Sequence, residues 1–333
     1  MAGAGRRERA GRVEPGRGGI DVGDVAMLAV VLMWAANNIV VKGALAELDP
    51  LAYVVGRFVI VVVALGLAGA ATRRIVVPRR ADWPLFLLVG SVGFALYNAL
   101  FTIGLDHTSV FSVALLVSLG PVFTMALAWA MRLERVRAGQ WVGAALAVGG
   151  VALFVQAKAS GGAAYNPFGD VLSLVAAACF AIYTIATRPL VVRYGATEVT
   201  GWATLLGLAM ILPVAWGAVR AQDWAGLHAA TWGALFYAGL VSLLVGYSLW
   251  AWAIRRRGVG RTTPYLFLIP VVTGVFSAVV FGERFGPLKL AGAALVLVGT
   301  AMVRLAAGKT SPPRPEATPE PASEAEVPLP SAR

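Results

Sequence analysis

Several residue types that build reactive sites are scarce in this chain of 333 residues. It contains one cysteine, Cys179, and two histidines, His107 and His228. A single thiol excludes an intrachain disulfide and a thiolate metal cluster, and we expect Cys179 to be a small buried residue within a helix. The histidines lie in different halves of the chain without a cluster of metal ligands beside them, so we assign no metal and no cofactor.

The motifs of common membrane enzymes and pumps are also missing. The nucleotide-binding pattern G-x-x-x-x-G-K-[ST] does not occur, which excludes ATP hydrolysis by this chain. No cluster of His, Asp, Glu and Ser suits acid–base or metal chemistry, which argues against a membrane-embedded enzyme. Every Asp and Glu lies at the end of an apolar run or beyond it. This argues against tight proton coupling through a buried carboxylate, and leaves facilitated exchange or coupling through Asp106, His107 or Glu198.

Charge is scarce as well. Asp, Glu, Lys and Arg make up 14% of the residues, whereas about 25% is typical of a soluble domain. Hydrophobic residues make up 59%, more than a soluble fold could bury, so we expect lipid around the chain. The net charge of +11 comes from short basic clusters between apolar runs. That distribution orients membrane segments and argues against a nucleic-acid partner.

Ten apolar runs follow one another, each long enough for a helix of about 20 residues to cross the hydrocarbon core. They cover residues 25–46, 50–70, 83–105, 109–131, 138–156, 169–187, 198–219, 232–254, 262–282 and 286–305. We therefore predict an all-α integral membrane protein with ten transmembrane helices.

The basic residues predict the orientation of these helices. Of the 28 Lys and Arg residues, 22 lie in the two tails and in the loops after even-numbered runs, all on one side. Both termini are therefore predicted to be cytoplasmic, in a multi-pass protein of the cell (inner) membrane. We expect residues 1–22 to form a disordered basic tail before a retained signal anchor, and residues 306–333 to form a disordered tail rich in Pro and Glu.

Two segments of the chain repeat each other at a shift of 149 positions. Residues 119–135 read LGPVFTMALAWAMRLER and residues 268–284 read LIPVVTGVFSAVVFGER. The first segment ends the fourth run and the second ends the ninth, so each copy of the repeated unit contains five runs. Because five is odd, the second copy must enter the membrane from the opposite side.

The beginnings of the copies match as well, with GDVAML at 23–28 and GDVLSL at 169–174. We predict two inverted five-helix repeats, over residues 23–155 and 169–305, joined by an external linker at 156–168. Inverted repeats are typical of carriers that open alternately to the two sides of the membrane around a site near its middle.

These features resemble the EamA-type drug/metabolite transporter family, over roughly residues 23–305. The resemblance rests on the two Pro…Glu-Arg segments and on Trp34, Asn37, Lys42, Pro50 and Arg57. It implies ten helices in two repeats and a small polar or amphipathic solute, since members move amino acids, nucleotides, sugars, vitamins or drugs. The chain departs from the pattern at Ala35, where a glycine is usual. The second copy lacks equivalents of Trp34, Lys42 and Arg57.

Polar and aromatic residues in the middle of the runs are candidates for solute binding. The candidates are Trp34, Asn37, Asn38, Lys42, Arg57, Tyr97, Asn98, Tyr183, Thr184, Tyr247 and Trp250, with Ser118 and Ser248 beside them. Each alone could serve a helix-to-helix hydrogen bond. Their concentration in the first, third, sixth and eighth runs predicts a common cavity.

Lys42 and Arg57 allow two interpretations. A charge inside an apolar run is costly unless it reaches the interface or finds a partner. Both could pair with external carboxylates, and Glu47 and Asp49 are close in sequence to Lys42. Alternatively, they attract an anionic group of the solute into a cavity.

The repeated segments carry further candidates. Pro121 and Pro270 remove a backbone donor and should kink the fourth and ninth helices, either for packing or along the solute path. Glu134 and Glu283 precede the fifth and tenth helices and should cap them or pair with the adjacent arginines, unless they handle solute or protons.

Small residues on one face of the fifth and tenth runs predict close helix packing. Gly143 and Gly150 are repeated as Gly292 and Gly299. The partner of each face is either the other copy or a second protomer, which leaves a homodimer open.

The sequence thus predicts a secondary transporter without ATPase activity, an exporter of a small metabolite such as an amino acid or a related amphipathic solute, working by alternating access. Membrane lipid and the solute are the expected partners. A lipid flippase or a non-transporting membrane subunit is the alternative.

Overall fold

The computed structural model describes residues 21–72, 76–160, 166–257 and 263–307. Within these ranges all regular structure is helical, and the prediction of an all-α membrane protein is confirmed. Nine described helices are long and apolar enough to cross a membrane, and a shorter apolar helix covers Tyr265–Phe281. The predicted tails lie outside the described residues except at their inner ends, where Val22 begins the first helix and Ala307 ends the last.

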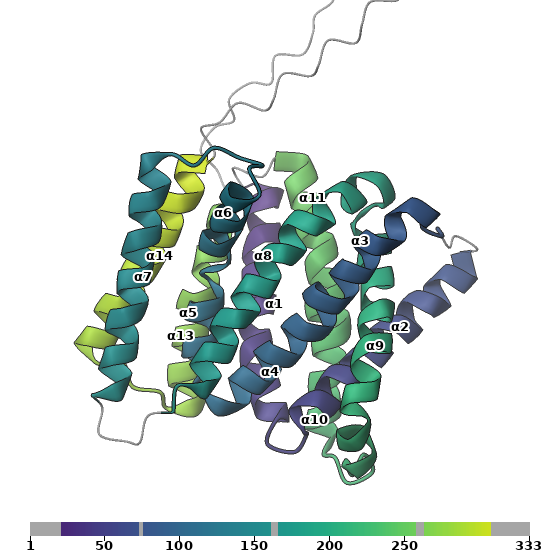
Figure 1. Cartoon of the computed structure of the whole chain (residues 1–333). Helices are drawn as coiled ribbons and strands as arrows, with labels where there is room; N and C mark the ends of the chain where they lie inside the picture. Colours follow the sequence, from purple (N-terminus) through teal and green to yellow (C-terminus); the bar gives the residue numbers. More distant parts are fainter. Residues whose placement is uncertain (1–20, 73–75, 161–165, 258–262, 308–333) are drawn as a thin grey trace, which may run out of the picture.

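The first five spans correspond to the first predicted repeat (Figure 1). They are α1 (Val22–Ala44), α2 (Pro50–Thr72), a third span made of η1 (Arg80–Asp82), α3 (Trp83–Leu88), η2 (Val89–Leu96) and α4 (Tyr97–His107), a fourth made of α5 (Val110–Val117) and α6 (Gly120–Ala130), and α7 (Ala138–Ala159).

The next five spans correspond to the second repeat. They are α8 (Phe168–Tyr194), α9 (Ala196–Ala221), an eighth span made of α10 (Ala229–Phe236), η3 (Tyr237–Val245) and α11 (Gly246–Arg257), a ninth made of η4 (Thr263–Phe267) and α13 (Leu268–Phe281), and α14 (Pro287–Ala307).

Helices begin and end at residues suited to the purpose. The Asp21 side chain accepts hydrogen bonds from the backbone of Gly23 and Asp24 at the start of α1, and Asp49 accepts one from Leu51 at 2.7 Å at the start of α2. These carboxylates satisfy amide groups that have no partner within the helix. Gly282 ends α13 with φ 65°, a left-handed conformation that glycine adopts without a steric penalty.

The two copies run in opposite directions through the bundle. Lys42, in the last turn of α1, donates to the carbonyl of Thr108 at 3.4 Å. The hydroxyl of Thr108 donates to Asp170, in the first turn of α8, at 2.7 Å. The end of α1 and the start of α8 therefore lie at the same end of the bundle, as expected for inverted repeats.

We call this end the linker face, because α7 ends and α8 begins there. The opposite end, where α1 begins and α14 ends, is the tail face. In Figure 1 the tail face is at the top and the linker face is at the bottom.

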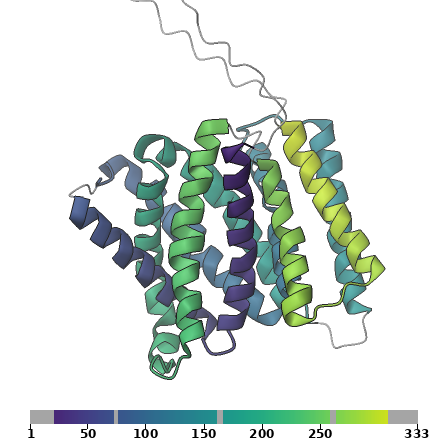
Figure 2. The same cartoon turned by 180° about the vertical axis from the view of Figure 1, so that it is seen from behind.

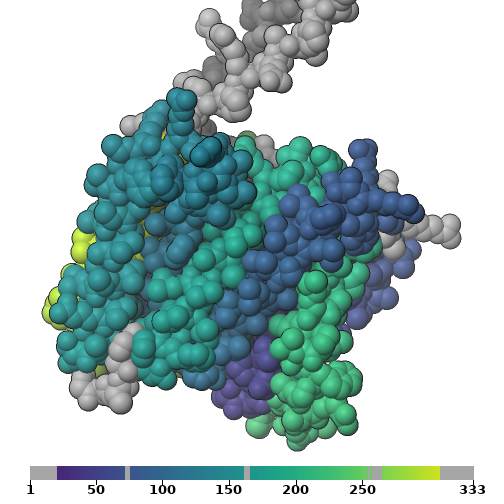
Figure 3. Space-filling model, viewed as in Figure 1, coloured from purple at the N-terminus to yellow at the C-terminus, as the bar shows by residue number. Residues whose placement is uncertain are grey.

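Equivalent helices of the two copies pack in equivalent ways. α1 packs on α11, η3 and α13 of the second copy, and its counterpart α8 packs on α4, η2 and α6 of the first. Figure 2 shows α1 between α11 and α13, and Figure 3 shows α8 on the surface between α6 and the third span. This exchange brings residues of both copies into the middle of the bundle.

α7 and α14 form one edge of the bundle, side by side (Figures 1 and 2). A Cβ atom at Gly299 would lie 2.4 Å from the backbone oxygen of Gly143, and one at Gly150 would lie 2.8 Å from that of Gly292. The backbones thus approach to a distance that only glycine permits. The glycine faces predicted from the sequence pair with each other within the chain.

The third and eighth spans share a feature that periodicity did not predict. η2 and η3 are π-helical segments at matching positions of the two copies. They lie directly before the segments that carry Tyr97 and Tyr247. π-helical turns inside α-helices are frequent at functional sites because the extra residue shifts the side chains that follow.

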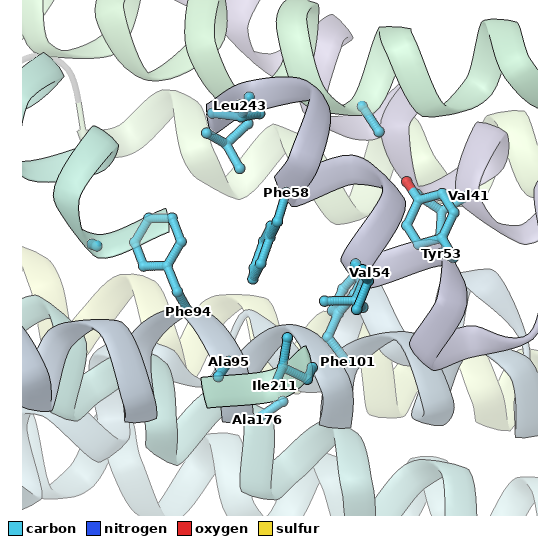
Figure 4. Close-up of a cluster of buried hydrophobic side chains, with 14 of the residues drawn as sticks. Val41, Tyr53, Val54, Phe58, Phe94, Ala95, Phe101, Ala176, Ile211 and Leu243 are labelled. Carbon is cyan, nitrogen blue, oxygen red and sulfur yellow. The ribbon is translucent and has the colours of Figure 1, made fainter. Parts of the chain in front are cut away.

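The main apolar cluster joins α1, α2, α8, α9 and the third and eighth spans. Figure 4 shows Tyr53, Val54 and Phe58 of α2 in this cluster, with the Phe58 ring 6.0 Å from that of Phe94. The outer surface is apolar too: Val214 on α9 is 76% exposed and Val279 on α13 is 79% exposed. Side chains of this kind are stable on the outside when lipid is the solvent.

Candidate functional site

Two aromatic groups meet near the middle of the bundle. In the first, the Trp34 ring of α1 lies 5.3 Å from that of Tyr247 and 6.0 Å from that of Trp250 on α11. In the second, Phe180 of α8 lies 5.5 Å from Tyr97 on α4 and 5.6 Å from Tyr183. Each group combines a helix from one copy with a span from the other.

These groups are equivalent under the repeat. Phe180 occupies in α8 the position of Trp34 in α1, at the shift of 146 that aligns the two GDV motifs. The prediction that Trp34 has no equivalent holds for tryptophan, but an aromatic counterpart exists and makes the matching contact with Tyr97. We call these two groups together the central aromatic region.

Arg57 is the charged residue of this region. It is 6% exposed, and its Nη2 donates to Oδ1 of Asn98 on α4, which is also 6% exposed. The Tyr53 and Phe58 rings lie 5.8 Å and 5.7 Å from the guanidinium. Arg57 Nε is buried without a hydrogen-bond partner. The guanidinium is thus desolvated against aromatic rings and one neutral amide.

Lys42 has different surroundings, at the linker face. Its Nζ donates to the carbonyls of Leu105 at 2.7 Å and Asp106 at 2.9 Å, besides that of Thr108. These carbonyls end α4, where the helix dipole favours a cation. The suggested partners Glu47 and Asp49 are engaged elsewhere: Asp49 caps α2, and Glu47 binds the eighth span.

The remaining polar candidates differ in what they contact. Asn38 Nδ2 donates to the Thr273 hydroxyl of α13 at 3.2 Å, which joins the two copies. Asn37 Oδ1 is buried without a hydrogen-bond partner. Thr184 is exposed and its hydroxyl returns to the carbonyl of Phe180 at 2.8 Å, within its own helix.

A small hollow with a cavity volume of about 10 Å³ lies between Tyr247 and the start of α9. It is lined by Ala196, Thr197, Thr200, Leu244, Tyr247 and Ser248. The start of α9 lies beside the end of α8, which is at the tail face. The hollow therefore lies on the tail-face side of Tyr247.

Two inverted copies around an aromatic and polar centre are the geometry of a carrier, and comparison with known proteins agrees. Residues 21–156 and 167–305 match the model of the EamA-like transporter family. The chain belongs to this family. It is therefore a multi-pass membrane transporter, as the sequence predicted.

Relatives of this EamA-like transporter include named exporters. A probable terminal-alkyne amino-acid exporter of Streptantibioticus cattleyicolor is 31% identical over 84% of this chain and 92% of its own length. A probable amino-acid metabolite efflux pump of Salmonella typhimurium is 28% identical over 82% of this chain and 91% of its own. A solved crystal structure that is 18% identical has a TM-score of 0.60 over 86% of this chain and 99% of its own, which supports the fold.

The two repeated prolines of this EamA-like transporter lie at helix starts. Pro121 is in the first turn of α6, after a break that separates it from α5, and Pro270 is in the first turn of α13, after the 3₁₀ turn η4. In a first turn the missing amide has no helical partner to lose. The expected kinks are therefore breaks that divide the fourth and ninth spans.

The two repeated glutamates behave differently from each other. Glu283 Oε1 accepts from the backbone of Val110 at 3.0 Å, so it caps α5 across the copies, whereas we expected it to cap α14 or to pair with Arg284. Its Oε2 is buried without a hydrogen-bond partner. Glu134 is exposed, four residues before α7, and at the start of that helix Gln140 Oε1 accepts from the backbone N–H of Arg137 at 2.9 Å. The two copies therefore differ in how they use this glutamate, since only Glu283 contacts the other copy.

Polar contacts join the two copies at both faces of this transporter, and we call these contacts clasps. At the linker face, Lys158 forms an ion pair with Asp170 at 2.7 Å, with side chains 14% and 3% exposed. At the tail face, Asp82 forms an ion pair with Arg193 and accepts from the hydroxyl of Tyr194. Sequence reasoning did not single out these pairs, because their partners are up to 112 residues apart.

A third clasp joins the loop after α1 to the eighth span. Glu47 accepts from the His228 backbone at 3.1 Å and from the Thr231 hydroxyl at 2.8 Å, and it pairs with the His228 ring at 2.8 Å. The backbone N–H of His228, with the Thr231 hydroxyl second, lowers the pKa of Glu47 below its ordinary value of 4.5. Both residues are exposed, and this places a titratable contact at the linker face.

Proposed function

We propose that this protein exports a small amphipathic metabolite, such as an amino acid, across the inner membrane by alternating access, with both termini in the cytoplasm. The observation that carries the proposal is the pair of equivalent aromatic groups around Trp34–Tyr247 and Phe180–Tyr97. Aromatic faces bind the apolar or cationic part of a solute, and the buried polar groups beside them bind its charged end.

The clasps support the alternating part of the proposal. Lys158–Asp170 and Glu283–Val110 tie the copies at the linker face, and Asp82–Arg193 ties them at the tail face. A carrier of this architecture rocks one copy against the other, so the contacts at one face must break while those at the other hold. The names of the relatives, which mention amino-acid and metabolite export, favour an amino acid as the first solute to test.

The proposal is tested by counterflow in liposomes that contain the purified protein. Liposomes loaded with unlabelled L-leucine or L-phenylalanine should accumulate the same labelled amino acid, whereas Trp34→Ala should reduce the rate at least about tenfold. Movement of a fluorescent phospholipid without amino-acid counterflow would replace the proposal with a flippase. Wild-type liposomes that accumulate neither amino acid would refute the amino-acid assignment.

A further inference from the structure

Arg57 is a cation that the fold has left without a counter-charge. It lies seven residues into α2, about 10 Å from the helix start at 1.5 Å per residue. Its guanidinium stays charged at any physiological pH. No Asp or Glu in the described part of the chain forms an ion pair with it. A buried membrane cation of this kind is costly, and such residues commonly serve the transported species.

The hydrogen bonds of the guanidinium show which edge is open. Nε and Nη2 point along the same edge, the edge that a carboxylate binds with its two oxygens. In this structure Nη2 donates to the neutral Oδ1 of Asn98, and Nε is buried without a partner. This edge of the guanidinium can bind two oxygen atoms, and in this structure the Asn98 oxygen occupies only one of the two positions.

From this geometry we propose that Arg57 binds the carboxylate of the solute through Nε and Nη2, displacing Asn98. The inference rests on the proposed function and narrows its substrate to small amphipathic carboxylic acids, amino acids included. In the absence of solute, Asn98 supplies an oxygen in place of one carboxylate oxygen. The exchange of a neutral for a charged acceptor strengthens the hydrogen bonds and neutralises the buried cation.

The surroundings of Arg57 agree with this class of solute. The Tyr53 and Phe58 rings lie beside the guanidinium, and Asn98, which accepts from it, is adjacent on α4 to Tyr97 of the second aromatic group. A molecule held by its carboxylate on Arg57 would therefore reach the aromatic groups with its apolar end. Lys42 offers no such site, because three backbone carbonyls surround its ammonium group.

Selectivity of the wild-type protein provides the first test and needs no variant. In the counterflow assay, unlabelled L-leucine and 4-methylpentanoate, which lacks the amino group, should compete with labelled L-leucine. Leucine methyl ester and isopentylamine should compete at least about tenfold less well. Equal competition by the ester or the amine would overturn the inference while leaving amino-acid transport intact.

The variant Asn98→Asp gives the second test. It places a carboxylate of the protein next to the Arg57 guanidinium, where it imitates the carboxylate of a bound solute. L-leucine counterflow should fall at least about tenfold, while the thermal stability in detergent is kept or raised. Arg57→Gln should lose the preference for leucine over its methyl ester.

Lys289→Gln is the matched control for these variants. Lys289 is a half-buried cation of α14 that lies 5.0 Å over the Phe285 ring, outside the central region. The preference for leucine over its ester should be unchanged in this variant. Leucine transport by Asn98→Asp at the wild-type rate, or wild-type selectivity in Arg57→Gln, would refute the role of Arg57. Absence of both leucine and phenylalanine transport by the wild type would refute the amino-acid assignment of the proposed function instead.

Discussion

The glycine contact between α7 and α14 makes a prediction whose magnitude can be worked from the structure. The change is Gly299→Ala. The added Cβ would lie 2.4 Å from both Ala147 N and Gly143 O, whereas ordinary contact begins at 3.4 Å. The two helices would have to separate by about 1 Å along this contact, because backbone atoms cannot rotate away as a side chain can. Overpacking of this kind typically costs about 1–3 kcal/mol.

Gly149→Ala is the matched control, because Gly149 lies on α7 and a Cβ atom added there would meet no neighbouring atom within 4 Å. Both substitutions replace glycine by alanine within a transmembrane helix, so the gain in helix propensity of up to about 1 kcal/mol cancels between them. The difference between the two variants therefore isolates the packing contact.

Reversible unfolding in mixed micelles of increasing SDS content measures the free energy of unfolding of each variant. We expect Gly299→Ala to be less stable than Gly149→Ala by about 1–3 kcal/mol. Equal stability would mean that α7 and α14 are not held at the distance described.

Three further predictions concern the faces of the bundle. Because the pKa of Glu47 is lowered, the ionised carboxylate contributes to stability above pH 4.5, and this contribution is lost as the pH falls through the lowered pKa. The Tm of the wild type should therefore fall in that pH range. The Tm of Glu47→Gln should not show this fall. Lys158→Met should lower the free energy of unfolding by about 3–5 kcal/mol, since it removes the cation that pairs with the buried carboxylate of Asp170, and a loss below about 1 kcal/mol would contradict the buried pair. In a Cys179→Ser background, an impermeant maleimide added to intact cells should label Arg284→Cys but not Arg135→Cys, and the opposite pattern would reverse the proposed orientation.

The sequence was sufficient for the membrane-spanning helices and for the duplication. Apolar runs of about 20 residues have one stable form in lipid, a helix that satisfies its own backbone. The inverted orientation follows from counting, since a five-span unit repeated once must reverse. The close glycine contact was also predictable in kind, although its partner, α14 of the same chain, was not.

Helix breaks were harder to predict because they depend on neighbours. The sequence located Pro121 and Pro270 but not the division of the fourth and ninth spans into separate segments. It gave no sign of η2 and η3, since a π-helical segment keeps the same apolar composition as an α-helix. Glu283 was expected to cap α14 or to pair with the adjacent arginine, but its Oε1 accepts from the backbone of Val110 at the start of α5.

By itself, the sequence determined the solvent of this protein, its all-helical class and its internal symmetry, because these depend on composition and on local periodicity. Only the tertiary structure decided what each buried polar group contacts. Lys42 and Arg57 look alike as isolated charges in apolar runs, yet one meets three carbonyls and the other a single neutral amide. That difference arises from helices distant in sequence, whose packing sets the partners of a side chain.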